Sequence, residues 1–496
     1  MARPTIVALG DSLTQGFQHG AAHRLDWSFP SILARGLGLE VPRDHRVPAF
    51  GGPGYPFNLE HMLRHVSVEL GEGVALNQRL LRLPKLLAAY LDHIEDFYER
   101  GPGSTPEAHD VHYHNLASWG FTVNEALTLT ARTCAAFVER DEGLIQDDLF
   151  GMPSAPMYRA AQRVLNPAAN PARDDATMLD NLRALARDEP IDILLLWLGA
   201  NDCLGTVMHM KIQDMPASYT GTDPFARRDF NLTSKDQFRR DYEQLLDEVA
   251  AILDPNPGRG QVYVATVPHV TIPPITNGLG AMQGEYFERY ARFFRNDENY
   301  SSLTSRVLER DDAIRIDRRV DDFNDAIRSL TAARGWRIVD TAQMLDQLSI
   351  KRNACQADPG EPLRDYLAAR AKLSGHDHTK HPLLALDPVP SIAAYEVRAD
   401  PLGTHQRSAG GLFSLDHVHP STIGYGLAAE RFLEEIQANN PGDAAIGAAR
   451  IDWDAVLLHD TLEQAPPVLW DDLMRNAEGY AWVWELISAS FARHVI

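Results

Sequence analysis

The sequence predicts a doubly wound α/β fold, in which helices cover both faces of a parallel β-sheet. Two observations lead to this prediction. Short apolar segments of strand type alternate along the chain with longer segments of helical periodicity, which is typical of parallel sheets. In addition, the 496-residue chain is 44% apolar, which is ample for a large core.

Five segments have the length and composition of buried parallel strands, and each ends in a turn signal or a polar residue. They are Thr5–Leu9, Val111–Asn115, Asp192–Leu198, Gln261–Val267 and Trp336–Asp340. We therefore expect five strands whose sequence positions are spread over most of the chain.

Helical periodicity is clearest in two segments. In the first, Ser234 and Gln237 have capping-box spacing, and Asp254-Pro255 ends the pattern. The second ends at Gly335. The apolar residues that recur at three- and four-residue steps are Phe238, Tyr242, Leu245, Val249 and Ile252 in the first, and Val320, Phe323, Ile327 and Leu330 in the second.

Three long segments interrupt the alternation of strands and helices, at about residues 40–110, 268–299 and 345–413. They exceed ordinary connections several-fold, and such lengths usually indicate lids or binding walls. Because the expected strands are distributed around them, we interpret them as insertions in one domain over residues 1–440.

The tail over residues 441–496 is expected to form helices that pack on the core. Its apolar and aromatic residues recur at helical steps, and it lacks the basic face of a membrane-surface helix. These residues are Trp453, Val456, Leu457, Tyr480, Trp484, Ile487 and Phe491.

Charge and composition exclude several classes of protein. The formal net charge of −21 argues against nucleic acid or anionic membrane as a partner. The longest apolar run, Ile193–Leu198, is far too short to span a bilayer. No signal-peptide pattern is visible, so we expect a cytoplasmic protein, or a secreted one if a signal was removed before this numbering.

Cysteine and histidine spacings give no metal signature. Cys134, Cys203 and Cys355 are odd in number and widely separated, which favours buried free thiols. Two histidine clusters raise the alternative of a metal site, but neither has the carboxylate or cysteine ligands of a known signature. We therefore expect no metal and no cofactor. The clusters are His109, His112 and His114, and His376, His378 and His381.

Four separated segments carry side chains that acyl transfer needs. Ser12 follows the first strand at a turn flanked by glycines, where open α/β sheets place ligands and chemistry. Gly120 and Asn201 follow the second and third strands, where a backbone N–H and a side-chain amide can reach one crevice. Asp416 stands three residues before His419, a spacing that lets the carboxylate hold the imidazole Nδ1–H.

These groups match the parts of a serine hydrolase. The Ser12 hydroxyl needs a base to take its proton, for which His419 is the candidate, and Asp416 would orient that imidazole. The oxyanion of a tetrahedral intermediate needs donors, and Ser12 N–H, Gly120 N–H and the Asn201 side chain are candidates. The predicted catalytic residues are therefore Ser12, Asp416 and His419, with an oxyanion hole from Ser12, Gly120 and Asn201.

Each predicted residue also has a purely structural explanation. Ser12 and Asp416 could cap helices, Gly120 could be a turn glycine and Asn201 could close an Asx turn. Finding all of them together, in the right order, favours catalysis.

Three neighbouring polar residues are assigned to other roles. We interpret Asp11 and Asp202 as structural residues that bond backbone N–H groups near their turns. His417 is a rival to His419 as the base, but its position next to Asp416 makes a hydrogen bond between the two awkward.

The four segments resemble the sequence blocks of the GDSL esterases and lipases, also called SGNH hydrolases. The matching segments are Gly10-Asp11-Ser12-Leu13, Asn115 to Gly120, Gly199-x-Asn201-Asp202 and Asp416-x-x-His419-Pro420. The resemblance implies a three-layer α/β/α sandwich with a five-stranded parallel sheet, of flavodoxin-like type. It also implies catalytic and oxyanion roles for the same five residues.

We therefore expect a serine carboxylic-ester hydrolase of esterase or lipase type, acting on a small-molecule or lipid ester. A thioesterase, a sugar O-acetylesterase and a catalytically silent lipid- or carbohydrate-binding module are the alternatives. The apolar helical pattern from Leu80 to Phe97 favours longer acyl chains if it forms a wall of the site. The same pattern can equally pack on the sheet.

Overall fold

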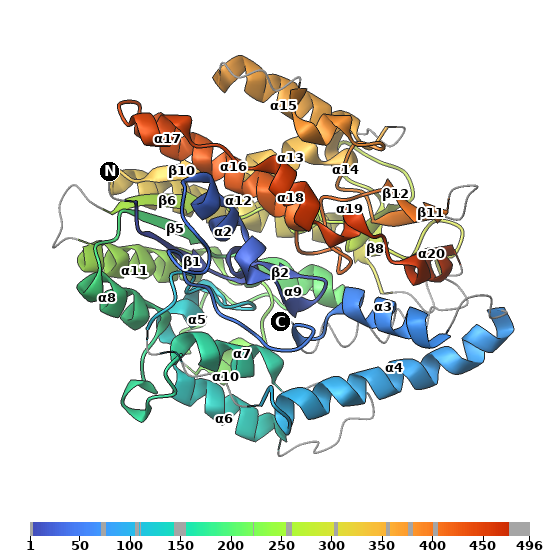
Figure 1. Cartoon of the computed structure of the whole chain (residues 1–496), viewed down its shortest axis with the longest axis horizontal. Coiled ribbons are helices and arrows are strands. Elements are labelled where there is room, and N and C mark those ends of the chain that lie inside the picture. The colour runs from blue at the N-terminus through green and yellow to red at the C-terminus, as the bar shows by residue number, and fades with distance from the viewer. Residues whose placement is uncertain are drawn as a thin grey trace.

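A parallel sheet lies at the centre of the protein (Figure 1). The computed structural model describes residues 3–70, 76–104, 109, 111–142, 155–221, 223–253, 260–301, 306–353, 358–374, 380–399 and 405–475. In this part of the chain the sheet has four strands in the order β1-β5-β6-β10. They are β1 (Ile6–Gly10), β5 (Ile193–Trp197), β6 (Gln261–Ala265) and β10 (Arg337–Val339).

The register of the sheet brings two predicted segments to one edge. Residues of β1 pair in parallel with those of β5, from Ile6 opposite Ile193 to Gly10 opposite Trp197. Both strands therefore end at the same level. Ser12 and Asn201 follow these ends by a few residues, so both leave the sheet at its carboxyl edge, where α/β proteins carry their sites.

Alternate residues of the strands pack against different sets of helices, because successive side chains of a strand point to opposite faces. Val7 and Leu9 belong to a core cluster with residues of α8 (Met178–Asp188), α11 (Lys235–Leu253) and α12 (Arg310–Ala333). Ile6 and Ala8 belong to another, with α2 (Phe29–Gly36), α13 (Thr341–Leu348) and α16 (Thr422–Asn439). Helices thus cover both faces, which confirms the predicted α/β character.

The predicted fifth strand, Val111–Asn115, is not confirmed as a strand. Only Asn115 forms a bridge, which is parallel and opposite Ala8. On the side away from β1, the Arg46 carbonyl accepts the N–H groups of His114 and Asn115, at 2.8 and 3.2 Å. A single carbonyl thus takes the hydrogen bonds of two successive residues, so this segment does not extend as a regular ladder.

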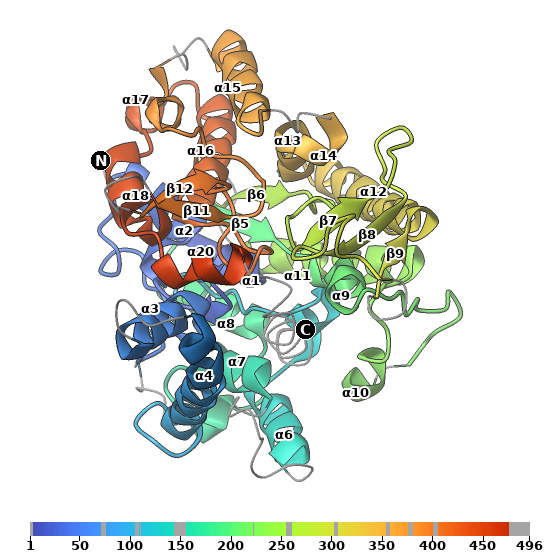
Figure 2. The ribbon, with the colours of Figure 1, turned by 90° about the vertical axis from the view of Figure 1, so that its right-hand side faces the viewer.

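The two helices predicted from apolar spacing are confirmed as α11 and α12. The other helices vary widely in length and lie around the sheet and in the inserted segments (Figures 1 and 2). They are α1 (Ser12–Gln15), α3 (Leu59–Leu70), α4 (Leu76–Glu99), α5 (Val123–Thr128), α6 (Ala131–Glu142), α7 (Pro156–Leu165), α9 (Asn201–His209), α10 (Pro224–Arg227), α14 (Ile350–Asn353), α15 (Glu361–Ser374), α17 (Ala444–Ala448), α18 (Trp453–His459), α19 (Thr461–Gln464) and α20 (Val468–Arg475).

Three small antiparallel sheets lie outside the central one. Their strands are β2 (Phe17–Gln18), β3 (Ala21–Ala22) and β4 (Tyr55–Pro56); β7 (Thr276–Leu279), β8 (Arg289–Arg292) and β9 (Leu308–Glu309); and β11 (Glu396–Ala399) and β12 (His405–Ala409). The latter two sheets fall mainly in the predicted second and third insertions. The division into a 1–440 domain and an extension stays a prediction, and residues 476–496 of the tail lie outside the described residues.

The apolar face of α4 is used in packing. Leu83, Leu87, Tyr90 and Ile94 are buried in the same cluster as residues of α3 such as Leu63. The described residues of the Leu80–Phe97 pattern thus pack against α3, whereas the alternatives raised from the sequence were an acyl-binding wall and packing on the sheet.

The cysteines of the described residues are placed as the sequence predicts. Cys134 and Cys203 are buried free thiols, as predicted, whereas Cys355 lies outside the described residues.

Among the helices that the structure describes, none combines the length and the apolar character that crossing a bilayer requires.

Candidate active site

Asp416 and His419 form a tight, buried turn before α16. Asp416 Oδ1 accepts the backbone N–H groups of Val418 and His419, at 2.9 and 2.8 Å. Asp416 Oδ2 lies 3.0 Å from His419 Nδ1, and each side chain is only 2% exposed. The spacing of three residues thus closes both the backbone turn and the side-chain pair.

This pair fixes the protonation of both partners. Burial alone would raise the pKa of Asp416, but the His419 imidazole and the two backbone donors outweigh it and hold the pKa below its usual range. Since the Asp416 carboxylate is an acceptor, His419 Nδ1 carries a proton and Nε2 is the atom left to act as a base. Within the described residues, Nε2 has no hydrogen-bond partner.

Ser12 begins the four-residue helix α1 directly after β1. Asp11 caps this helix by accepting the Leu13 N–H at 3.0 Å, and Gly16 ends it at a φ of 97°. Gly10 lets the turn pack closely, because a Cβ there would lie 2.6 Å from the Trp197 carbonyl oxygen. These constraints hold Ser12, which is 6% exposed, at the edge of the sheet.

Residues near the two ends of the sequence meet beside Ser12. The Tyr425 hydroxyl on α16 donates to the Phe17 carbonyl at 2.8 Å and lies 3.4 Å from the Ser12 carbonyl. The Phe17 ring in turn packs on the His419 ring, with centroids 4.7 Å apart. The predicted segments are therefore neighbours, but no hydrogen bond joins Ser12 Oγ to His419 Nε2 among the described residues.

Two backbone N–H groups at this edge, those of Ser12 and Gly120, have no acceptor among the described residues. The Ser118 N–H donates to the Gly10 carbonyl at 3.1 Å, which fixes the segment leading to Gly120 against the Ser12 turn. Gly120 itself has a φ of 78°, a conformation that favours glycine. In the part of the chain that the structure describes, the N–H groups of Ser12 and Gly120 donate to no protein atom.

Asn201 is the first residue of α9 and lies two residues after Gly199, in the turn that follows β5. One N–H of its side-chain amide donates to the Phe121 carbonyl at 3.0 Å. An amide NH₂ has two donors, so this bond orients the side chain and leaves the second N–H available.

Asp11 and Asp202 bond backbone N–H groups near their turns, as predicted. Besides the cap that Asp11 provides, Asp202 accepts the Val123 N–H at 3.0 Å and the Thr233 hydroxyl at 2.8 Å. Burial raises the pKa of each carboxyl to about 7. Both are integral to the edge on which the predicted site residues stand.

His417 is held away from the base position. Its Nε2 accepts the Tyr395 N–H at 3.2 Å, and its ring packs on Phe293, with centroids 4.2 Å apart. Burial lowers its pKa to about 4, so the ring is neutral near pH 7. These contacts favour His419 over its rival His417.

The sequence analysis missed two residues that contact the Asp416 segment. The Gly20 N–H donates to Asp416 Oδ2 at 2.8 Å, and His19 Nδ1 accepts the Leu415 N–H at 3.2 Å. A two-residue turn that ends in glycine, here His19–Gly20, does suit a hairpin. Its partners, however, lie almost 400 residues away in sequence, as the separation of 396 between Gly20 and Asp416 shows.

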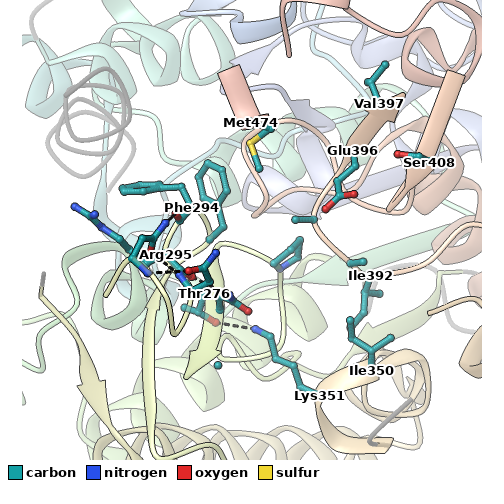
Figure 3. A pocket seen from close by; sticks show the side chains of 18 of the residues that line it. Thr276, Phe294, Arg295, Ile350, Lys351, Ile392, Glu396, Val397, Ser408 and Met474 are labelled. Atoms are coloured by element: carbon teal, nitrogen blue, oxygen red, sulfur yellow. Dashed lines mark hydrogen bonds between the residues drawn. The ribbon is translucent and has the colours of Figure 1, made fainter. Parts of the chain in front are cut away.

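Two cavities lie near these segments. One, of about 90 Å³, is bordered by Gly120 and Asn201 together with polar residues such as Glu125 and Arg228. The other, of about 740 Å³, contains none of the predicted site residues. Figure 3 shows Phe294 and Thr276 on one side of it, with Glu396 of the β11–β12 hairpin across from them.

The two histidine clusters of the sequence raised the alternative of a metal site. Within the described ranges, no group of three or more His, Cys, Asp or Glu residues is arranged to hold a metal ion. In the first histidine cluster, His114 bonds Glu189 at 3.0 Å and the Arg46 N–H at 2.8 Å. His376 and His378 of the second cluster lie outside the described residues.

Comparison with known proteins gives one match. The family model described as GDSL-like Lipase/Acylhydrolase matches residues 6–432 of this chain, a span that includes all four predicted segments. No curated protein and no solved structure matches the chain.

Proposed function

Because the chain belongs to the GDSL-like lipase/acylhydrolase family, we propose that it hydrolyses carboxylic esters through an acyl-enzyme on Ser12. Family membership supports ester hydrolysis in general. The observation that carries the assignment to particular residues is the buried Asp416–His419 pair, with a 3.0 Å bond that leaves Nε2 free.

In the acylation step, Ser12 Oγ attacks the ester carbonyl carbon while its proton passes to His419 Nε2. The Asp416 carboxylate stabilises the imidazolium that forms and keeps the ring in the required orientation. The tetrahedral intermediate then collapses, the bond to the alkoxy oxygen breaks, and His419 returns its proton to the leaving alcohol. The step requires Oγ and Nε2 to come into hydrogen-bond contact, and catalytic contacts of this kind often tighten only when substrate binds.

The oxyanion of the intermediate accepts hydrogen bonds from Ser12 N–H, Gly120 N–H and the second N–H of the Asn201 side chain. The two backbone donors have no acceptor among the described residues, which supports this role. Donors that are already in place stabilise developing charge without having to reorient during the reaction.

Deacylation repeats these steps with water as the nucleophile. His419 takes a proton from water, the hydroxide attacks the acyl carbon, and the proton is returned to Ser12 Oγ as the acid is released. The products are one carboxylic acid and one alcohol, and the protein is regenerated.

The proposal is tested by the hydrolysis of p-nitrophenyl acetate and p-nitrophenyl butyrate by wild type and by Ser12→Ala. We expect turnover by wild type and its near-complete loss in the variant, with an unchanged melting temperature because the Ser12 hydroxyl makes no hydrogen bond among the described residues. Equal turnover by both proteins would overturn the role of Ser12, and no turnover by either would favour a binding module.

A further inference from the structure

We propose that His19 and Glu60 form a second histidine–carboxylate pair that positions Asp416, and through it His419. The inference rests on the proposed function, since it assigns two positioning residues to the same site. It gives part of the first insertion a role in holding the site together.

The tip of the β2–β3 hairpin is a two-residue turn. The strands Phe17–Gln18 and Ala21–Ala22 are joined by only two residues, His19 and Gly20, whose φ values are 56° and 82°. Two successive positive φ angles are the requirement of a type I′ hairpin turn. In such a turn, the two consecutive N–H groups point outward. We call these two residues the hairpin tip (His19–Gly20).

Both outward N–H groups bind the segment that ends in Asp416. The His19 N–H donates to the Ser414 hydroxyl at 2.9 Å, and the Gly20 N–H donates to Asp416 Oδ2 at 2.8 Å. The latter is the same oxygen that pairs with His419 Nδ1. The hairpin tip therefore sets where the carboxylate of the predicted triad lies.

The His19 side chain ties this tip to Glu60. Its Nδ1 accepts the Leu415 N–H at 3.2 Å, so the proton of the ring is on Nε2. Nε2 lies 3.5 Å from Glu60 Oε2, and the two side chains are 3% and 6% exposed. The Leu59 N–H at the start of α3 also donates to the His19 carbonyl, at 2.8 Å.

Glu60 is itself fixed on its other sides. Arg64 Nη2 lies 2.5 Å from Glu60 Oε1, and the Thr461 hydroxyl donates to Oε2 at 2.8 Å. Burial would raise the pKa of Glu60, but His19 and Arg64 together lower it below the ordinary value. An ionised Glu60 thus orients the His19 ring, and the ring holds the backbone of Leu415 next to Asp416.

Three parts of the chain therefore form one connected set of contacts that ends at Asp416. α3 supplies Glu60, the hairpin supplies His19 and Gly20, and Thr461 of α19 completes the contacts. Figure 2 shows α3 beside α20. The helix α3 serves here as a support for the Asp416 segment.

Two variants and one matched control test the proposal. Glu60→Gln removes the charge that orients His19, and His19→Asn removes the imidazole while suiting the left-handed backbone. Glu69→Gln, the control, removes a carboxylate at an exposed position of the same helix, α3. The measurements are kcat and KM for p-nitrophenyl acetate and the pKa of His419 from histidine NMR titration.

We expect kcat to fall about 10- to 100-fold in both variants, with KM changed less than about twofold, because the general base is misplaced. The pKa of His419 should fall in both, since a displaced Asp416 supports the imidazolium less well. His19→Asn keeps the charge of Glu60. A lower pKa of His419 in this variant would therefore be due to a displaced Asp416 and not to the loss of a distant charge. Glu69→Gln should match wild type in every measurement.

The proposal is overturned if folded Glu60→Gln and His19→Asn keep the wild-type His419 pKa, whatever happens to kcat. A lower kcat with an unmoved pKa would indicate a merely structural contribution to folding. The NMR titration does not need turnover, so failure of the proposed hydrolysis, seen as no Ser12-dependent activity in wild type, is recognised separately.

Discussion

Asp416 Oδ2 lies 3.0 Å from His419 Nδ1 and also accepts the Gly20 N–H at 2.8 Å. One carboxylate oxygen thus joins a residue near the end of the described chain to one near its start. The tautomer of His419, and with it the availability of Nε2, follows from this contact.

Asp416→Asn is expected to lower kcat/KM by about 10³-fold or more, because an amide can donate as well as accept and no longer selects the Nδ1–H tautomer. Steady-state kinetics with p-nitrophenyl acetate measure the effect. His417→Gln is the comparison, since His417 bonds Tyr395 and not Ser12, and it should lose far less activity. A residual activity of Asp416→Asn within tenfold of wild type would exclude Asp416 as the orienting acid.

Asn201→Ala is expected to lower kcat about 10²- to 10³-fold with little change in KM, because a donor to the developing oxyanion is lost. Asn124→Ala is the matched control, since Asn124 borders the same small cavity without a predicted role. Equal effects of the two substitutions on kcat would contradict the assignment of Asn201.

Gly10→Ala is expected to lower the free energy of unfolding by about 1–3 kcal/mol, because the added methyl group overpacks the turn. A Cβ at this position would lie 2.3 Å from Thr14 Cβ and 2.6 Å from the Trp197 carbonyl oxygen. Gly442→Ala has no atom within 4 Å of its added Cβ and serves as the control. Urea unfolding compares the stability of the two variants. Equal midpoints would show that the turn at Gly10 has room for a methyl group.

Asp11→Asn is expected to become more stable relative to wild type as the pH rises. Burial raises the pKa of Asp11 from 3.8 to about 7, so the folded wild type holds a proton that the unfolded chain releases at lower pH. The contribution of protonated Asp11 to the free energy of unfolding is complete below pH 3.8 and is lost as the pH rises through about 7. The total loss is at most about 4 kcal/mol.

Urea unfolding of wild type and Asp11→Asn from about pH 5 to about pH 8, a range that includes the raised pKa of about 7, measures this effect. Asp325→Asn is the control, because Asp325 is 83% exposed and should show a stability difference that is constant with pH. A constant difference for Asp11→Asn as well would mean that Asp11 is ionised in the folded protein throughout this range.

The sheet and its helices were largely predictable because their signals are local. The strands at Ile6–Gly10 and Ile193–Trp197 differ from the predicted ranges by one residue at each end. The helix Lys235–Leu253 follows directly from its apolar spacing. The segment 111–115 misled the prediction because its composition suits a strand, whereas its hydrogen bonds depend on Arg46, far from it in sequence.

The candidate site was predictable where partners are close in sequence and not where they are distant. The Asp416–His419 pair follows from a spacing of three residues. The contacts of His19 with Leu415 and Glu60 depend on a hairpin tip meeting two other segments, which no local pattern encodes. The fold therefore had to be known before these contacts could be found.

The most direct test of the account is a fluorophosphonate probe followed by peptide mass spectrometry. The account predicts a single covalent adduct on Ser12, formed rapidly in wild type, slowly in His419→Ala and not at all in Ser12→Ala. An adduct on another residue, or undiminished labelling of Ser12→Ala, would contradict it.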